Sequence, residues 1–328
     1  MNKLLMAAVA FALVTAFAGY SHDGGSKSDS VNIATVKVTG AEFTGSLENE
    51  LWDYEGAFTA ARSIKINDFY IGKYEVTKDE YKAVMKGNKL GLNADPSCSS
   101  SDPAKYKITA GEIDGKRAVE NVTWFDAVYF CNLLSEKDGL TSAYKIENPV
   151  VSDGHITDAT VEPVAGADGW RLPTEIEWEY AARGGDTKSA AWKYKYSGVD
   201  SSLTSDEISD TALDAAGWYW YNTASGTTAD DDPESGTPGY GTHQVGKKAP
   251  NTLGICDMSG NVWEWCYDWY SNIGPTTPLA GPSEGSYRIW RGGSWGDDAN
   301  IACVAFRLND IPDFRFINLG FRVVRSAQ

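Results

Sequence analysis

Near its end the chain reads Arg288-Ile-Trp-Arg-Gly-Gly-Ser-Trp295 and, after a further stretch, Asn318-Leu-Gly-Phe-Arg-Val-Val-Arg325. Within residues 291–325 we distinguish two kinds of position. The first kind is mostly arginine, glycine, proline and aromatic residues, which suit the fixing of a backbone path. These frame positions are Arg291, Gly292, Gly293, Ser294, Trp295, Arg307, Pro312, Arg315, Gly320, Phe321 and Arg322.

The second kind of position follows neither the period of two of a strand nor the 3.6-residue period of a helix. From Gly296 to Leu319 the chain contains no Lys, Glu, Gln, Met or Trp. These are the residue types that an AAC or AAT codon cannot become when only its adenines change. The segment therefore fits a gene region diversified at adenines. The alternative is that a short window lacks common residues by chance.

The overall composition favours a folded protein and excludes some partners. Of the 328 residues, 42% are hydrophobic and 12% aromatic, so the chain can bury a substantial core without metal or disulfide crosslinks. Its formal net charge of −16 argues against binding to nucleic acid or to anionic membranes, because both require a basic surface.

Residues 1–20 have the features of an export signal. Lys3 precedes the apolar run Leu4–Ala18, which has the length of a signal-peptide core and is too short to cross a bilayer comfortably. A bacterial lipoprotein carries a cysteine where this chain has Tyr20. We therefore expect membrane attachment only through an N-terminal lipid anchor, in a copy with cysteine at that position. The sequence predicts export, either to the cell surface or outer membrane or as a secreted protein.

Three helices are indicated by capping boxes, in which a hydroxyl and a carboxylate three residues later satisfy the free amides of a helix start. The boxes are Thr77-Lys-Asp-Glu80, Thr123-Trp-Phe-Asp126 and Thr174-Glu-Ile-Glu177. Elsewhere short β-prone runs alternate with long loops rich in Gly, Asn, Asp and Pro, with no repeat and no second core. We predict a single α+β domain at residues 62–328, and we interpret residues 21–61 as a polar tether and N-terminal extension.

The five cysteines and three histidines do not form a metal-binding pattern. There is no C-x-x-C, and His22, His155 and His243 lie far apart, so a zinc or iron site is not expected. Cys256 and Cys266 flank a Gly-Asn turn and can pair in an exported protein, although nothing in the sequence requires the bond.

The chain resembles the formylglycine-generating, or sulfatase-modifying-factor, family from about residue 62 to its end, because six motifs occur in the order of that family. The motifs are Gly72-Lys-Tyr-Glu-Val-Thr77, Val122-Thr-Trp-Phe-Asp-Ala127, Trp170-Arg-Leu-Pro-Thr-Glu-Ile-Glu-Trp-Glu-Tyr-Ala-Ala-Arg183, Met258-Ser-Gly-Asn-Val-Trp-Glu-Trp265, Arg291-Gly-Gly-Ser-Trp295 and Gly320-Phe-Arg322. The resemblance implies a C-type lectin-like fold, in which a few strands and two main helices support extensive loops. This fold agrees with the α+β domain predicted from the residues.

Enzymes of this family oxidise a substrate cysteine with two cysteines, four residues between them, that follow the Gly-Gly-Ser motif. Such chemistry needs thiolates that bind copper or exchange disulfides. By the resemblance these positions fall on Asp297 and Ala302, and Cys303 stands alone one residue away. A carboxylate and a methyl group do neither job, so we expect no catalysis. The alternative is an oxidase of this type with relocated chemistry.

The resemblance also implies a calcium site beside the Gly-Asn-Val-Trp-Glu-Trp motif. The matching ligands are the side chains of Asp257 and Glu264 and the carbonyls of Gly260 and Val262, and hard oxygen donors of this kind suit calcium. The alternative is that Asn261 and Glu264 only hydrogen-bond the loop. No other cofactor is expected.

A lectin-like domain with this C-terminal segment also resembles the variable proteins of diversity-generating retroelements, in particular their exported, lipoprotein-type members. The resemblance implies that loops expose the variable side chains to an unknown protein or other surface ligand, with Phe306, Phe314 and Phe316 as the best anchors. We expect a surface-displayed, monomeric, non-catalytic binding protein; a calcium- and carbohydrate-binding surface protein is a further alternative. The implied ligand-binding residues are Gly296, Asp297, Asp298, Asn300, Ile301, Cys303, Phe306, Leu308, Asn309, Asp310, Ile311, Phe314, Phe316, Ile317, Asn318 and Leu319.

Overall fold

The computed structural model describes residues 31–45, 56–202, 208–225 and 233–327. The predicted export signal at residues 1–20, including Tyr20, lies outside the described residues. Within the described residues, no helix combines the length and the apolar character needed to cross a membrane.

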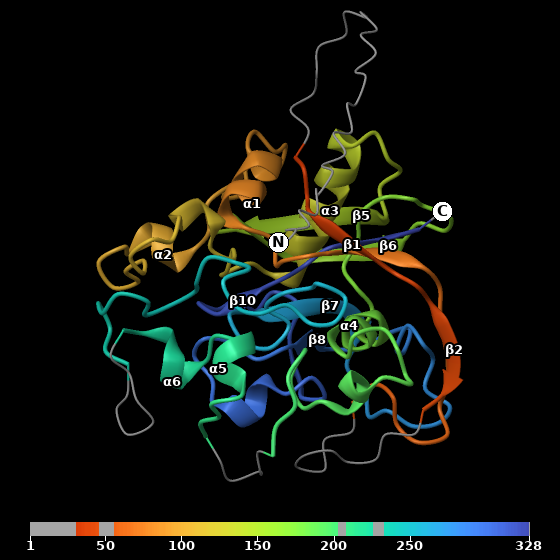
Figure 1. Cartoon of the computed structure of the whole chain (residues 1–328). Helices are drawn as coiled ribbons and strands as arrows, with labels where there is room; N and C mark the ends of the chain where they lie inside the picture. Colours follow the sequence, from red (N-terminus) through yellow and green to blue (C-terminus); the bar gives the residue numbers. More distant parts are fainter. Residues whose placement is uncertain (1–30, 46–55, 203–207, 226–232, 328) are drawn as a thin grey trace, which may run out of the picture.

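A central sheet contains the motifs nearest the C-terminus (Figure 1). Its strands, in spatial order, are β10 (Leu319–Gly320), β7 (Trp263–Trp269), β8 (Arg288–Arg291) and β9 (Arg307–Asp310). β10 runs parallel to β7, whereas β7, β8 and β9 are antiparallel neighbours. β9 is therefore an edge strand of this sheet.

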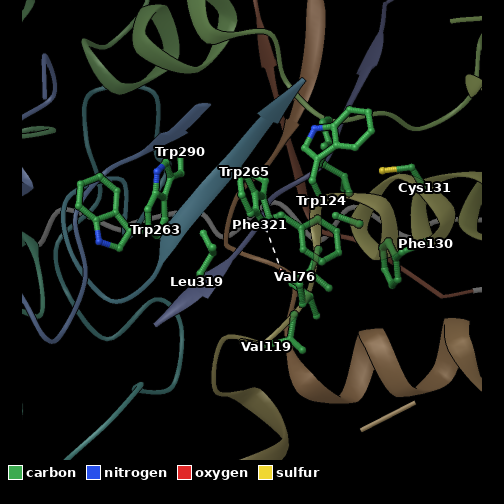
Figure 2. Close-up of a cluster of buried hydrophobic side chains, with 14 of the residues drawn as sticks. Val76, Val119, Trp124, Phe130, Cys131, Trp263, Trp265, Trp290, Leu319 and Phe321 are labelled. Carbon is green, nitrogen blue, oxygen red and sulfur yellow. Dashed lines mark hydrogen bonds between the residues drawn. The ribbon is translucent and has the colours of Figure 1, made fainter. Parts of the chain in front are cut away.

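The alternation of side chains along β7 gives the sheet two different faces. Trp263 and Trp265 point to one face together with Trp290 of β8, and they pack against α1 (Lys78–Met85) and α3 (Trp124–Lys137) in one aromatic cluster (Figure 2). Cys266 of β7 and Ile289 of β8 belong to a second cluster, which α4 (Glu175–Ala182) shares. The sheet therefore separates two cores.

The three predicted helix starts are confirmed. Thr77, Thr123 and Thr174 are the N-caps of α1, α3 and α4, and each forms both hydrogen bonds of a capping box. In each case the hydroxyl accepts from the amide three residues later, and that residue's carboxylate accepts from the cap amide. The caps fix where α3 and α4 begin, and packing in the two cores places these helices on opposite faces of the sheet.

Strands precede the predicted domain start at residue 62. β1 (Thr35–Val38) pairs with β4 (Phe69–Gly72), which also pairs with β11 (Val324–Ser326). β2 (Ala41–Thr44) pairs with β3 (Ser63–Ile66). Within the predicted polar tether and N-terminal extension, the strands of residues 35–44 therefore pair with strands of the domain. Their pairing partners lie elsewhere in the chain, so no local pattern revealed them.

The remaining elements are short, apart from one hairpin. The hairpin consists of β5 (Tyr144–Ser152) and β6 (His155–Pro163). The short helices are α2 (Cys98–Ser101), α5 (Leu213–Ala216) and α6 (Trp220–Thr223), with 3-10 turns η1 (Asp114–Lys116), η2 (Ala190–Lys193) and η3 (Ala299–Ala302).

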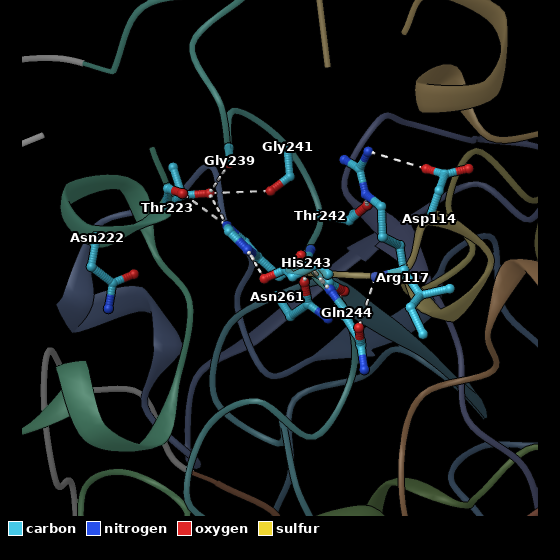
Figure 3. A network of polar contacts seen from close by, with 12 residues as sticks. Asp114, Arg117, Asn222, Thr223, Gly239, Gly241, Thr242, His243, Gln244 and Asn261 are labelled. Atoms are coloured by element: carbon cyan, nitrogen blue, oxygen red, sulfur yellow. Dashed lines mark hydrogen bonds and ion pairs between the residues drawn. The ribbon is translucent and has the colours of Figure 1, made fainter. Parts of the chain in front are cut away.

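Buried hydrogen bonds fix the long loops that surround the sheet (Figure 3). The His243 amide donates to Asn261 Oδ1 at 2.8 Å, and the Thr223 hydroxyl donates to the carbonyl oxygens of Gly239 and Gly241 at 3.0 and 3.1 Å. Arg117 Nε donates to the nearby Thr242 hydroxyl at 3.2 Å. The loops are irregular in outline, but their backbone groups have defined partners.

A buried ion pair joins β7 to the last strand-forming segment. Arg322 donates through Nη2 and Nε to the two carboxylate oxygens of Glu264, both at 2.6 Å, and both side chains are fully buried. Arg322 also donates to the carbonyls of Gly72 and Cys256, at 3.0 and 3.1 Å. One guanidinium thus connects three separate segments of the chain.

We expect Arg322→Ala to lower the free energy of unfolding by about 3–5 kcal/mol, because Glu264 would remain as a buried charge without its partner. Urea unfolding followed by circular dichroism measures the change. The control is Lys145→Ala, which breaks an exposed ion pair with Glu147 and should cost under about 1 kcal/mol. Equal losses in the two variants would contradict the role assigned to Arg322.

Candidate functional site

Two carboxylates on α4 bind frame arginines of residues 291–325, which we call the variable segment. Glu175 and Glu179 lie one helical turn apart. Arg307 Nη2 donates to Glu175 Oε2 at 2.8 Å, and Arg291 pairs with Glu179 while also donating to the carbonyl of Phe306. Burial raises the pKa of Glu175, but Arg307 and Arg291 outweigh burial and hold that pKa below its usual value. The arginines are thus paired beneath the segment.

Backbone carbonyls between residues 297 and 317 are also held by donors that are not variable positions. The donors are amides or ring nitrogens of residues outside the variable positions, and each carbonyl belongs to a residue between 297 and 317. The contacts are Trp220 N to Asp297 O at 2.9 Å, Trp124 N to Pro312 O at 3.0 Å, Asn121 N to Phe316 O at 3.0 Å and Trp295 Nε1 to Ile317 O at 3.3 Å. A carbonyl accepts in the same way whatever its side chain is, so these contacts do not depend on the variable residues.

Most of the predicted ligand-binding residues reach the surface. Ile311 and Phe316 are the most exposed, at 43% and 48%. The Phe316 ring stacks on Phe314 with centroids 5.9 Å apart, and Phe314 in turn contacts Trp290 of the core. Half-buried positions complete the set: Gly296, Asp297, Asp298, Ile301, Leu308, Asn309, Asp310, Phe314 and Ile317. We call the exposed and half-buried positions the variable surface.

Five of the predicted residues are buried, and for these the expectation of exposure is wrong. Leu319 pairs with Trp263 in the central sheet, and the Phe306 ring lies 6.1 Å from that of Trp263. The Asn318 amide donates to the Ser294 hydroxyl at 2.7 Å, inside the frame. These side chains support the surface rather than contact a ligand; the buried residues are Asn300, Cys303, Phe306, Asn318 and Leu319.

Residues 308–310 do not form the loop that the sequence analysis expected. They belong to β9, and all residues of that strand are half-buried. Among the described strands β9 pairs only with β8, so its other edge is open and its side chains on both faces are partly accessible. An edge strand, and not only a loop, can therefore display consecutive residues.

The positions of the catalytic cysteines carry no thiol chemistry. Ala302 and Cys303 are buried, and burial raises the pKa of the Asp297 carboxyl to about 6. No disulfide is formed among the five cysteines, all of which lie in the described residues, so the possible Cys256–Cys266 pair is not bonded. Burial raises the pKa of Cys256 to about 11 and that of Cys266 well above its usual value, which disfavours the reactive thiolate.

The residues of the expected calcium site already have protein partners at Glu264 but not at one oxygen of Asp257. Arg322 and the Trp178 indole donate hydrogen bonds to the Glu264 carboxylate, and the Asn261 amide donates to Glu75 Oε2 at 2.9 Å. Asp257 keeps one buried oxygen without a partner, but the described residues hold no group of three His, Cys, Asp or Glu suited to a metal. Arg322 neutralises Glu264, but Glu75 and Asp257 are also buried here, so the calcium ligands expected at Asp257, Gly260, Val262 and Glu264 stay a prediction.

A groove of about 660 Å³, which no sequence pattern predicted, borders the variable surface. Its walls come from β6, from residues 283–286 and from residues 311–313, and its aromatic lining includes Trp124, Tyr267 and Trp269. Arg288 lies among these rings. The groove residues come from five segments of the chain, so no local pattern predicted the groove, although Trp124 and Arg288 lie in or beside motifs of the family.

Comparison with known proteins identifies the family. The profile described as sulfatase-modifying factor enzyme 1-like domain matches residues 25–327. The chain belongs to this family. The match includes β1 and β2, in agreement with their pairing. The predicted C-type lectin-like α+β fold of the formylglycine-generating type, loop-rich and with one domain, is confirmed.

Three similar proteins differ in the activity that their names state. Treponema denticola variable protein 1 has 31% identity and a TM-score of 0.70, over 92% of this chain and 97% of that chain. The chaperone protein LppX of Paenibacillus barcinonensis is 33% identical over 323 residues, 96% of this chain and 98% of that protein. The formylglycine-generating enzyme of Streptomyces coelicolor is 29% identical over 300 residues, 89% of each chain. The expected likeness to variable proteins is thus confirmed.

Two phenylalanines of the variable segment differ in burial: Phe306 is buried and Phe316 is exposed. We expect Phe306→Ala to lower the free energy of unfolding by about 3–5 kcal/mol, because it leaves a cavity beside Trp263. Phe316→Ala should cost under about 1 kcal/mol, because half of its ring is already in water. Thermal and urea unfolding of both variants measure the difference. A larger loss for Phe316 than for Phe306 would show that the variable surface is misassigned.

Proposed function

We propose that this protein is a non-catalytic binding protein whose variable surface determines the ligand. The observation that carries the proposal is the way residues 291–325 are held. Buried arginine–glutamate pairs and external donors to main-chain carbonyls fix the path, whereas Ile311 and Phe316 project into solvent. Side chains at the surface can change without changing the contacts that fold the segment.

The comparisons and the residue chemistry support the same proposal. Treponema denticola variable protein 1 is named for variation, and LppX is named as a chaperone, so relatives of this chain include proteins not named as enzymes. The formylglycine-generating enzymes favour the alternative, an oxidase with relocated chemistry. Against this alternative stand Asp297 and Ala302 at the cysteine positions and the burial of Cys303.

The proposal includes export and diversification of the gene segment. An N-terminal signal would bring the protein to the cell surface or outside the cell, with a lipid anchor only where cysteine replaces Tyr20. A retroelement would rewrite adenines in the variable codons. Sequencing the surrounding DNA tests this part: we expect a second copy of the segment encoding residues 291–325, differing only at adenines, beside a reverse transcriptase gene. A neighbourhood with neither would remove the retroelement from the proposal.

We propose that binding needs no cofactor, that the protein acts as a monomer, and that the ligand is a protein or another surface molecule, not nucleic acid. Ile311, Phe314 and Phe316 would supply the anchoring energy, each about 2 kcal/mol or more on truncation, as large apolar groups do at interfaces. Asp298 and Asp310 would steer and select rather than dominate the affinity. Phe306, one of the expected anchors, is excluded because it is buried.

A library experiment tests whether the variable surface binds ligands. Six of its positions are diversified with the residues reachable from AAC, and the displayed library is selected on a purified probe protein, hen egg-white lysozyme. We expect lysozyme binders that keep the parent circular dichroism spectrum and bind equally in EDTA and in calcium. The diversified positions are Asp298, Leu308, Asn309, Asp310, Ile311 and Phe316.

A matched library provides the control. It diversifies exposed residues of β2 and β3, namely Glu42, Thr44, Ser63 and Lys65. Binders should arise from the first library at much higher frequency. Equal frequencies, or binders from the first library that no longer fold, would contradict the proposed function. Binding that requires calcium and is displaced by sugars would favour the carbohydrate-binding alternative.

The oxidase alternative has its own assay. We expect no conversion of a cysteine-containing sulfatase peptide by this protein, with or without copper, because no second thiol lies at position 297 or 302. Mass spectrometry of the peptide detects the aldehyde product. Turnover above background that disappears in Cys303→Ala would establish relocated chemistry and overturn the non-catalytic assignment.

A further inference from the structure

The groove beside the variable surface has a cationic floor. The guanidinium of Arg288 lies between two indoles, with its central carbon 3.7 Å from the ring centroid of Trp124 and 3.3 Å from that of Trp269. Arg288 is 4% exposed and lines the groove. The stacking fixes the plane of the guanidinium and leaves its edge as the group available for hydrogen bonds.

Arg288 lacks an anionic partner within the described part of the chain. Its Nη1 donates to the carbonyl of Tyr267 at 2.5 Å, but its Nε is buried with no hydrogen-bond partner, and no carboxylate forms an ion pair with it. Burial lowers the pKa of Arg288 to about 9, whereas the paired Arg307 and Arg322 have raised pKa values. The buried frame arginines Arg291 and Arg322 are paired with glutamates, whereas no ion pair is found for Arg288 among the described residues.

An unpaired buried charge is energetically costly. The unpaired guanidinium of Arg288 therefore indicates a ligand that supplies the missing anion. The donors Nε and Nη2 lie on one edge of the guanidinium, the geometry that a carboxylate accepts with two oxygens. Asp158, Glu162 and Asp313 line the outer part of the groove and are exposed. The groove therefore suits a ligand whose carboxylate reaches the floor and whose basic groups face the rim.

One wall of the groove is the edge of a strand. Residues 157–163 of β6 all line it, without the alternation that a strand face would show. β6 pairs only with β5 among the described elements, so its other edge has free backbone donors and acceptors. An extended peptide can pair with such an edge through its main chain.

We propose that the groove binds the C-terminal end of a peptide or protein chain, which pairs with β6 and places its terminal carboxylate on Arg288. Basic side chains before the terminus face Asp158 and Glu162. Arg288 and its flanking indoles lie outside residues 296–319, so this floor stays constant while the variable surface, which contributes Ile311 to one wall of the groove, changes. The inference goes beyond the proposed function and does not require the variable surface to bind anything.

Three labelled peptides test the assignment by fluorescence anisotropy. The first is Lys-Val-Lys-Val with a free carboxyl end, the second is the same peptide as the C-terminal amide, and the third is an amidated Lys-Val-Glu-Val-Lys. We expect the first to bind roughly tenfold more tightly than the other two, because a charged hydrogen bond is lost without the terminal carboxylate. Equal binding of the first two peptides would overturn the proposal, and equal binding of the first and third would overturn the terminal assignment.

Variants of the floor and the rim locate the site. Arg288→Lys keeps the charge but loses the two adjacent guanidinium donors, so affinity for the first peptide should fall roughly tenfold. The matched control, Arg325→Lys, alters another arginine stacked on aromatic rings and should leave binding unchanged. The double variant Asp158→Asn with Glu162→Gln, at exposed positions, should weaken binding roughly two- to fivefold at low salt. Unchanged binding in Arg288→Lys would overturn the proposal.

The unmodified protein supplies a readout that does not depend on the folding of any variant. The side-chain Nε–H signal of Arg288 in a nitrogen-15 spectrum should shift when the first peptide saturates the protein and stay in place with the amide. A signal that does not move at saturation would overturn the assignment. Phe316→Ala should leave peptide binding intact, so failure here and failure of the variable surface can be told apart.

Discussion

Two glutamates one turn apart on α4 constrain the segment that ends the chain. Glu175 pairs with Arg307, and Glu179 with Arg291, at side chains that are almost fully buried. Charges leave water at a large cost, and a buried pair offsets that cost only when its geometry is good and its remaining donors have partners. Such pairs therefore select one conformation over its alternatives. The backbone between residues 291 and 325 follows the one path that satisfies its arginines.

Because the path is fixed from beneath, the outer side chains are free to differ. The edge strand β9 and the loop that contains Phe316 carry them, and neither depends on those side chains for its main-chain contacts. The groove at Arg288 has the opposite character: its charged floor is built from α3, β7 and β8 and is constant. A changeable surface beside a constant pocket would let one scaffold combine a general anchor with a specific contact.

The sequence indicated local features more reliably than exposure. The capping boxes at Thr77, Thr123 and Thr174 lie at true helix starts, because a cap acts within a single turn. The sequence predicted burial less well. Phe306 and Phe316 occur in the same irregular pattern, but Phe306 packs on Trp263 and Phe316 faces solvent. Their difference arises from which neighbours the fold brings near, and no spacing in the chain encodes it.

The sequence by itself determined the family fold, the three helix starts, the frame arginines and the loss of the thiol pair, since each follows from residue types at short spacing or in ordered motifs. Tertiary structure alone decided the partner of each charge. It placed Arg322 on Glu264, where the motif had implied a calcium ligand, and it left Arg288 between two indoles without an anion. Coulomb interactions and desolvation depend on distances across the fold, and distances between remote segments are not present in the order of residues.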